Sequence, residues 1–263
     1  MKGRRKLTDK TDIVVILDRS GSMETAAKDH EGGLNSFVQD QRELAGDVRF
    51  TLIQFDSENP CEVQYDGVPM EEVQRCRLIP RGGTPLLDAV GKGVTHVRER
   101  LIREQRKPDL VICMIITDGE ENSSLEFQKA TVKSLIERCE RDEGWKFLFL
   151  GANIDAFAEA GGLGVGRGAS MNFANNAVGT ESMYASLTSN TLQARRLSAK
   201  GAAASVSAQA LCYSYAQRAG AMGADAAAVT PEGEQGLTTT IPQPRGLKTT
   251  IGGTGPRKGK KIE

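Results

Sequence analysis

Short apolar runs alternate with longer amphipathic stretches over residues 11–200 of the chain. Residues 13–17, 111–116 and 147–150 are almost entirely apolar, which is typical of strands buried on both faces of a parallel sheet. Residues 86–101, by contrast, repeat apolar side chains at steps of three and four, which indicates a helix with one buried face. Strands and helices that alternate in this way predict an α/β fold.

The full pattern predicts a doubly wound, mostly parallel central sheet with helices on both faces, a Rossmann-like arrangement. Residues 62–65 alternate polar and apolar side chains after the Asn59-Pro60 turn, so they predict one short antiparallel strand at the edge of the sheet. The expected strands are 12–18, 48–55, 62–65, 111–116, 145–150 and 169–173, and the expected helices are 24–44, 86–101, 125–139, 154–160 and 180–199.

The composition changes toward both ends of the chain. Residues 1–10 form a basic N-terminal extension, and residues 11–200 hold the α/β pattern. Residues 201–230 are rich in Ala with few large apolar side chains, which predicts a partly ordered helical extension. Gly, Pro and Thr dominate residues 231–263 ahead of a basic end, and this composition predicts a disordered tail.

Charge and cysteine content narrow the classes of partner and compartment. The chain has 34 basic and 34 acidic residues, so no overall positive field favours nucleic acid. Five cysteines, at positions 61, 76, 113, 139 and 212, have no spacing typical of a disulfide framework. Apolar runs fall short of the roughly 18 residues of a membrane span, and no signal-like segment precedes the first strand. We therefore expect a cytoplasmic protein without a membrane partner.

Oxygen-bearing side chains follow two of the predicted buried strands. Asp18, Ser20 and Ser22 come directly after the first strand, and Asp118 comes just after the strand 111–116. Thr84 stands behind a Gly pair at the head of a predicted helix. Because ligands gather at the carboxyl ends of parallel strands, these three segments are expected to meet. Carboxylates combined with hydroxyls suit a hard cation, Mg²⁺ first, with Mn²⁺ and Ca²⁺ as further candidates.

The order Asp18-x-Ser20-x-Ser22, then Thr84, then Asp118 resembles the von Willebrand factor A (VWA) domain with its metal-ion-dependent adhesion site (MIDAS). The resemblance covers about residues 12–175 and is greatest to stand-alone bacterial and phage members. It implies that the two serines and the threonine ligate Mg²⁺ directly. It also implies that the two aspartates act directly or through water, and that one position on the ion stays open for an acidic side chain of a partner.

Other chemistries fit these residues less well. An EF-hand loop counted from Asp18 would put Met23 and Asp29 where Gly and Glu are required. Zinc is poorly supported by two histidines and no Cys-x-x-Cys pair, and no phosphate-binding loop is present. An aspartate phosphotransferase usually has a second acid two positions after the first, where this chain has Ser20. We therefore expect a protein that is not an enzyme.

The sequence favours a non-enzymatic, Mg²⁺-dependent binding module that captures an acidic side chain of a partner protein. The resemblance points to partners such as ring-forming ATPases or assembly components. One alternative is a structural or assembly component, of a phage or a stress operon, that uses the fold as a scaffold. A metal-dependent phosphohydrolase is the third hypothesis, and it lacks a general acid or base.

Several neighbours of the candidate ligands are further site candidates. Arg19, Met23, Arg81 and Glu120 flank the ligands and are expected to contact a partner or to tune its approach. Asp56 leaves the second strand on the same side as Asp18, so it is a candidate for orienting a metal-bound water or a serine hydroxyl.

Overall fold

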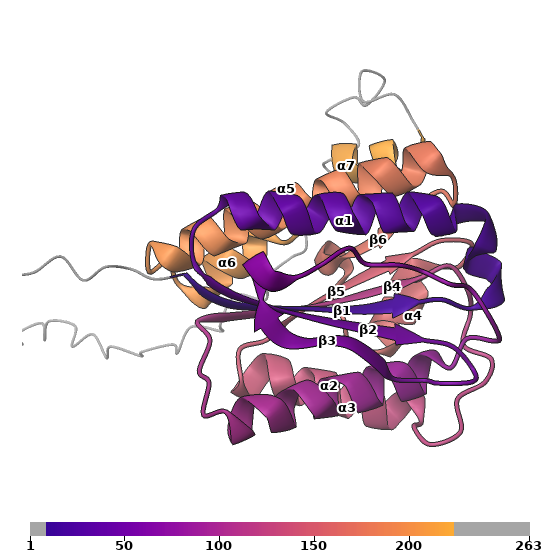
Figure 1. Cartoon of the computed structure of the whole chain (residues 1–263), viewed down its shortest axis with the longest axis horizontal. Helices are drawn as coiled ribbons and strands as arrows, with labels where there is room; N and C mark the ends of the chain where they lie inside the picture. Colours follow the sequence, from indigo (N-terminus) through magenta and orange to yellow (C-terminus); the bar gives the residue numbers. More distant parts are fainter. Residues whose placement is uncertain (1–8, 224–263) are drawn as a thin grey trace, which may run out of the picture. The chain divides into compact units, whose positions relative to one another are not determined.

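The computed structural model describes residues 9–223, in which a six-stranded sheet carries helices on both faces (Figure 1). Neighbouring strands pair in parallel except β2 and β3, which are antiparallel, so the predicted mostly parallel sheet with one antiparallel edge strand is confirmed. The strands, in the spatial order β3-β2-β1-β4-β5-β6, are β1 (Lys10–Asp18), β2 (Asp47–Phe55), β3 (Glu62–Pro69), β4 (Leu110–Thr117), β5 (Lys146–Gly151) and β6 (Ser170–Asn172).

Helices α1 and α5 cover one face of the sheet, and α2 and α3 cover the other (Figure 1). The alternation of side chains along β1 explains the two layers. Val15 packs in the core with Phe37 of α1, whereas Ile16 packs with Val94 of α2. The helices are α1 (Ala27–Glu43), α2 (Leu86–Arg103), α3 (Lys129–Asp142), α4 (Ala156–Gly162), α5 (Ala177–Ala199), α6 (Ala204–Ala210) and α7 (Tyr215–Ala221), with short 3-10 helices η1 (Gly21–Ala26), η2 (Met70–Glu72) and η3 (Arg167–Ala169).

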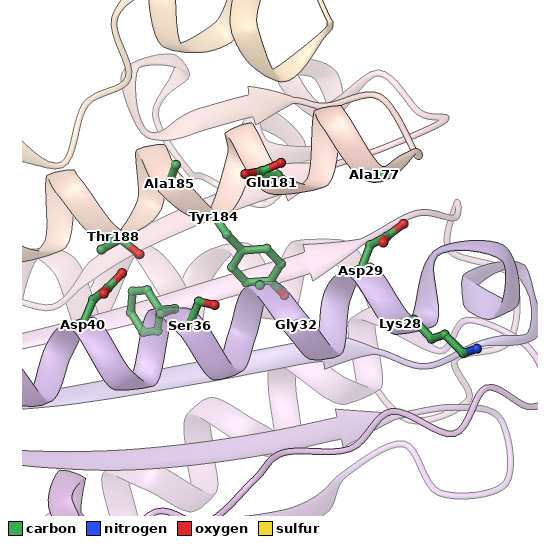
Figure 2. Close-up of a pocket in the computed structure, with 12 residues that line it drawn as sticks. Lys28, Asp29, Gly32, Ser36, Asp40, Ala177, Glu181, Tyr184, Ala185 and Thr188 are labelled. Atoms are coloured by element: carbon green, nitrogen blue, oxygen red, sulfur yellow. The ribbon is translucent and has the colours of Figure 1, made fainter.

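Helices α1 and α5 approach closely because Gly33 has no side chain. A Cβ at this position would lie 2.1 Å from Cδ2 of Tyr184, whose ring reaches from α5 toward α1 (Figure 2). Beside this contact the two helices leave a groove of about 430 Å³, and Asp29, Asp40 and Glu181 are among its lining residues. The groove contains none of the five candidate metal ligands.

Four of the five predicted helices start two to four residues away from the observed ones, and local contacts explain two of these differences. The helix expected over residues 125–139 begins at Lys129, because the backbone N–H groups just before it donate to the carboxylate of Asp88. Leu125, the first residue of the expected helix, lies in the preceding loop and is 93% exposed. The helix expected to begin at residue 24 is preceded by the 3-10 turn η1, and only its later part is α-helical.

The described part of the Ala-rich segment packs against the sheet domain. Helices α6 and α7 lie against α5, and the side chains of Leu211 and Tyr213 are buried in the same core cluster as Leu187. The described part of this segment therefore supplies side chains to the core. The expected tail, residues 231–263, and most of the N-terminal extension lie outside the described residues. Within residues 9–223, no helix combines the length and the apolar character needed to cross a membrane.

Candidate metal centre

The two candidate aspartates lie at the carboxyl ends of adjacent central strands. Asp18 is the last residue of β1, and Asp118 directly follows Thr117, the last residue of β4. Strands β1 and β4 are parallel, with Leu17 opposite Ile116, so both chains leave the sheet at the same edge. The sheet register therefore brings together two acids that are a hundred residues apart in sequence.

The hydroxyl side chains join this pair. Ser22 Oγ donates to Asp118 Oδ1 at 2.5 Å and lies 3.0 Å from Ser20 Oγ. The backbone N–H of Ser20 donates to Asp18 Oδ1 at 2.7 Å. Thr84 reaches the same place, because a Cβ built on Gly119 would lie 3.1 Å from Thr84 Oγ1 and 3.6 Å from Ser22 Oγ. The structure thus brings the five candidate ligands together.

Backbone hydrogen bonds hold the Thr84 loop against the other two loops. The N–H of Gly21 donates to the carbonyl of Gly82 at 3.0 Å. Thr84 donates its N–H to Asn122 Oδ1 at 2.9 Å, and the N–H of Asn122 donates to the Thr84 carbonyl at 3.1 Å. Gly82 has φ +65°, a left-handed conformation that glycine adopts without strain. The loop geometry therefore presents the Thr84 hydroxyl to the site.

Both carboxylates are buried without a cationic partner. Asp18 is 0% exposed and Asp118 is 2% exposed, and no ion pair within residues 9–223 includes either of them. Burial raises the pKa of Asp18 to about 6, although the hydroxyl of Thr117 donates to its Oδ2 at 2.6 Å. Burial likewise raises the pKa of Asp118. Buried carboxylates are normally stabilised by a countercharge, so this pair has the chemistry of a cation site.

The donor set fits a hard divalent ion. Metal–oxygen distances of about 2.0–2.1 Å in an octahedral Mg²⁺ site put neighbouring ligand oxygens about 2.9 Å apart. The two serine hydroxyls are 3.0 Å apart, close to that spacing. Within the described chain no cluster of three or more His, Cys, Asp or Glu residues could hold a metal, so an ion here would depend on hydroxyl oxygens. Oxygen-only donors favour Mg²⁺, Mn²⁺ or Ca²⁺.

Solved structures share this architecture. No protein-family model matches the chain, and no curated protein matches it. The proximal thread matrix protein 1 of mussel byssus aligns with 70% of this chain and 46% of its own length, at 14% identity and a TM-score of 0.51. The chain has a VWA-type fold.

Two further solved structures are less similar. A von Willebrand factor type A protein from Catenulispora acidiphila matches at 14% identity and a TM-score of 0.47, over 77% of this chain and 43% of its own. The mussel protein has also been solved with a zinc-occupied MIDAS motif, and this structure matches at 15% identity and a TM-score of 0.45, over 63% of this chain and 42% of that one. At 14% identity the likeness to the mussel protein concerns the fold alone. The chain spans less than half the length of each of these proteins.

Two of the side chains expected to contact a partner are buried in this VWA-type fold. Met23 is 0% exposed and packs in the core, and Arg19 is 5% exposed. Arg19 donates to Asp56 Oδ2 at 2.5 Å and also pairs with Glu62. The prediction of a partner contact is therefore corrected for both residues, because neither side chain reaches the surface.

Arg81 and Glu120 lie nearer the solvent. The Arg81 side chain is 40% exposed, and its guanidinium pairs with Asp56 at 3.0 Å, with Glu58 at 3.4 Å and with Glu62 at 3.5 Å. It is thus already engaged by acids of its own chain. Glu120 is exposed directly after Asp118 and Gly119, so it stands at the rim of the site.

Asp56 binds the loop that follows β2 and is not part of the ligand cluster. Burial alone would raise the pKa of Asp56, but hydrogen bonds from Arg19, Arg81 and the backbone N–H groups of Glu58 and Asn59 hold it below its usual value. Its hydrogen bonds within the described structure include none to a candidate ligand, so they do not support the expected role in orienting a serine. Asp56 forms ion pairs with both Arg19 and Arg81, so neither guanidinium pairs with Asp18 or Asp118.

Three residues outside the candidate ligand set also contribute. Thr117 donates to Asp18, Asn122 fixes the Thr84 loop, and Asn175 Nδ2 donates to Asp118 Oδ2 at 2.9 Å. Thr117 directly precedes Asp118 at the end of a predicted strand, so its position gave a local signal. Asn175 lies 57 residues after Asp118 and had no such signal.

Proposed function

We propose that this VWA-type domain is a non-enzymatic binding module whose metal ion captures an acidic side chain of a partner protein. Mg²⁺ is the proposed ion, and its ligands are Asp18, Ser20, Ser22, Thr84 and Asp118. One observation carries the proposal: two buried carboxylates without a countercharge meet among hydroxyl groups, where Asp118 accepts from Ser22 and Asp18 accepts from Thr117. A divalent cation would satisfy both charges at once.

The composition of the site favours an anionic partner. Three of the five proposed ligands are neutral hydroxyls, so the protein contributes at most two negative charges to the ion. A cation whose charge is not overcompensated attracts another carboxylate, whereas a site made of carboxylates alone would repel it. Ser22 is exposed while Asp18 and Ser20 are buried, so the approach of a partner is expected on the Ser22 side.

The same donor set argues against catalysis. Phosphoryl transfer from an aspartate needs a neighbouring acid or base to move the proton, and position 20, two residues beyond Asp18, is a serine. Arg19 and Asp56, the nearest charged pair on these loops, are bound to each other. We therefore assign binding, not turnover, to the site.

The metal site is tested by calorimetric titration of the purified protein with Mg²⁺ alone. We expect the wild-type chain to bind one ion, and Asp18→Ala and Ser22→Ala to lose that binding because each removes a ligand. Ser36→Ala is the matched control, since Ser36 is an exposed serine of α1 outside the site. Equal Mg²⁺ affinity in the wild type and Asp18→Ala would refute the site.

The binding function is tested by affinity capture with and without Mg²⁺, read by mass spectrometry. We expect partners with accessible Asp or Glu side chains, such as a ring-forming ATPase or an assembly component, to be retained only with the ion and only by the wild-type chain. If this protein is instead a structural or assembly component that uses the fold as a scaffold, its partners should be retained without the ion. Partners kept equally by Asp18→Ala in excess chelator would favour that alternative.

A further inference from the structure

Asn175 joins the site from a part of the fold that supplies none of the five proposed ligands. It lies between β6 and α5, and the next residue, Asn176, caps α5 by accepting from the Gly179 N–H at 2.9 Å. The backbone on its other side is also held, because the N–H of Phe173 donates to the Gly151 carbonyl at 3.0 Å. A rigid connection therefore carries the Asn175 side chain.

The Asn175 amide fixes the second oxygen of Asp118. Its Nδ2 donates to Asp118 Oδ2 at 2.9 Å, while Asp118 Oδ1 accepts from Ser22. An ionised carboxylate only accepts hydrogen bonds, so the amide must turn its NH₂ group toward Asp118. The amide oxygen then points away from that carboxylate but stays beside it.

That oxygen, Asn175 Oδ1, is buried and has no hydrogen-bond partner among the described residues. Leaving a buried acceptor unsatisfied costs about 1–3 kcal/mol, so native structures usually provide a donor. Mg²⁺ in proteins keeps several of its waters, and a water bound through its oxygen has only hydrogens left to offer. A buried acceptor next to the proposed ion is the partner that such a water requires.

The geometry points to Asn175 as a positioning residue of the metal site: its NH₂ group orients Asp118 while its Oδ1 accepts a hydrogen bond from a water on the ion. This inference rests on the proposed Mg²⁺ site. It makes the site selective for a hydrated ion, because the amide supports the water as well as the carboxylate.

The test compares the Kd values of Mg²⁺ and Ca²⁺, measured by calorimetry, for the wild type, Asn175→Leu and Asn175→Ala. Loss of a residue that supports a metal ligand typically weakens metal binding about 10- to 100-fold, so we expect the Kd of Mg²⁺ to rise at least about tenfold. The Kd of Ca²⁺ is expected to rise less than about threefold, since Ca²⁺ accepts a flexible coordination sphere. Tm without metal is expected to fall only slightly, because both variants remove the orphaned acceptor but also a donor to the buried Asp118 carboxylate.

Asn176→Ser is the matched control, because serine also caps a helix and the change lies one residue away. If the wild type binds Mg²⁺ and Asp18→Ala does not, but both Asn175 variants bind as the wild type does, only the inference on Asn175 is wrong. Equal losses of Mg²⁺ and Ca²⁺ affinity in both Asn175 variants would show a purely structural role and overturn it. No Mg²⁺ binding by the wild type would overturn the proposed function and this inference together.

Discussion

The Asp18 carboxylate is enclosed at the end of β1, where the Ser20 N–H and the Thr117 hydroxyl donate to it. Two neutral donors replace only part of the hydration that a carboxylate has in water, so burial raises the pKa of Asp18 to about 6. A buried carboxylate lowers the stability of the fold but can bind a cation, and such groups are typical of binding sites.

The sign of the pH effect follows from this raised pKa. Below about pH 4 the carboxyl is protonated in both the folded and the unfolded chain, and burial carries no charge penalty. As the pH rises through about 6, the folded chain must bury a charge that the unfolded chain leaves in water. The shift corresponds to about 3 kcal/mol of folding free energy, lost between about pH 4 and pH 6 when no metal is bound.

Asp18→Asn is therefore expected to stabilise the metal-free protein at pH 7.5 by about 2 kcal/mol, measured by urea unfolding in chelator. Below about pH 4 the difference should vanish, because Asp18 is then neutral. Added Mg²⁺ should raise the stability of the wild type and leave Asp18→Asn unchanged. A variant that is less stable than the wild type at pH 7.5 in chelator would contradict the assigned cost of burial.

The sequence made most of the candidate site visible at the residue scale, for a physical reason. Ser20 and Ser22 lie two and four residues after Asp18, so one loop fixes all three side chains. Thr84 and Asp118 stand beside recognisable elements, and parallel pairing brings such ends together. The contact of Asn175 was missed because this residue lies 57 residues after Asp118, and no local pattern specifies the path of the chain between them.

At the scale of elements, the segment between β4 and α3 is shaped by the first turn of α2. Asp88 accepts from the N–H groups of Leu125, Glu126 and Phe127 at 2.7–2.9 Å. These residues therefore serve as a bound loop instead of a helical turn, and α3 starts at Lys129. Apolar spacing in the sequence could not reveal this, because the competing acceptor lies about forty residues upstream.

Asp88→Ala is expected to lower the free energy of unfolding by about 2 kcal/mol, because three backbone donors lose a charged acceptor. It should also weaken Mg²⁺ binding, since the freed loop carries Asn122, which holds Thr84. Asp88→Asn keeps one acceptor oxygen and should lose less stability. Urea unfolding and Mg²⁺ titration of both variants check this expectation, and unchanged stability of Asp88→Ala would show that the loop stands without the contact.

At the scale of the whole described molecule, the sheet core extends beyond the segment that carries the candidate ligands. Arg195 of α5 is fully buried, where it pairs with Asp9 at 2.8 Å and donates to the Gln41 and Leu44 carbonyls of the α1 end. The sequence pattern indicated the α/β fold. It did not indicate that the Ala-rich residues after α5 also add to the core, because these residues have little apolar periodicity. Their contribution comes from a few side chains placed by tertiary contacts.

Leu211 tests whether residues 201–223 are part of that core. Its side chain is 2% exposed among core residues, so Leu211→Ala is expected to cost about 2–4 kcal/mol through lost apolar contact and the cavity left behind. Val206→Ala removes apolar atoms from the same segment, but Val206 is 46% exposed and should cost less than about 0.5 kcal/mol. Urea unfolding of the two variants shows whether residues 201–223 stabilise the domain or only pack on its surface. Equal, small losses would mean that the segment packs on the domain without stabilising it, whereas the expected difference would extend the folding unit past residue 200.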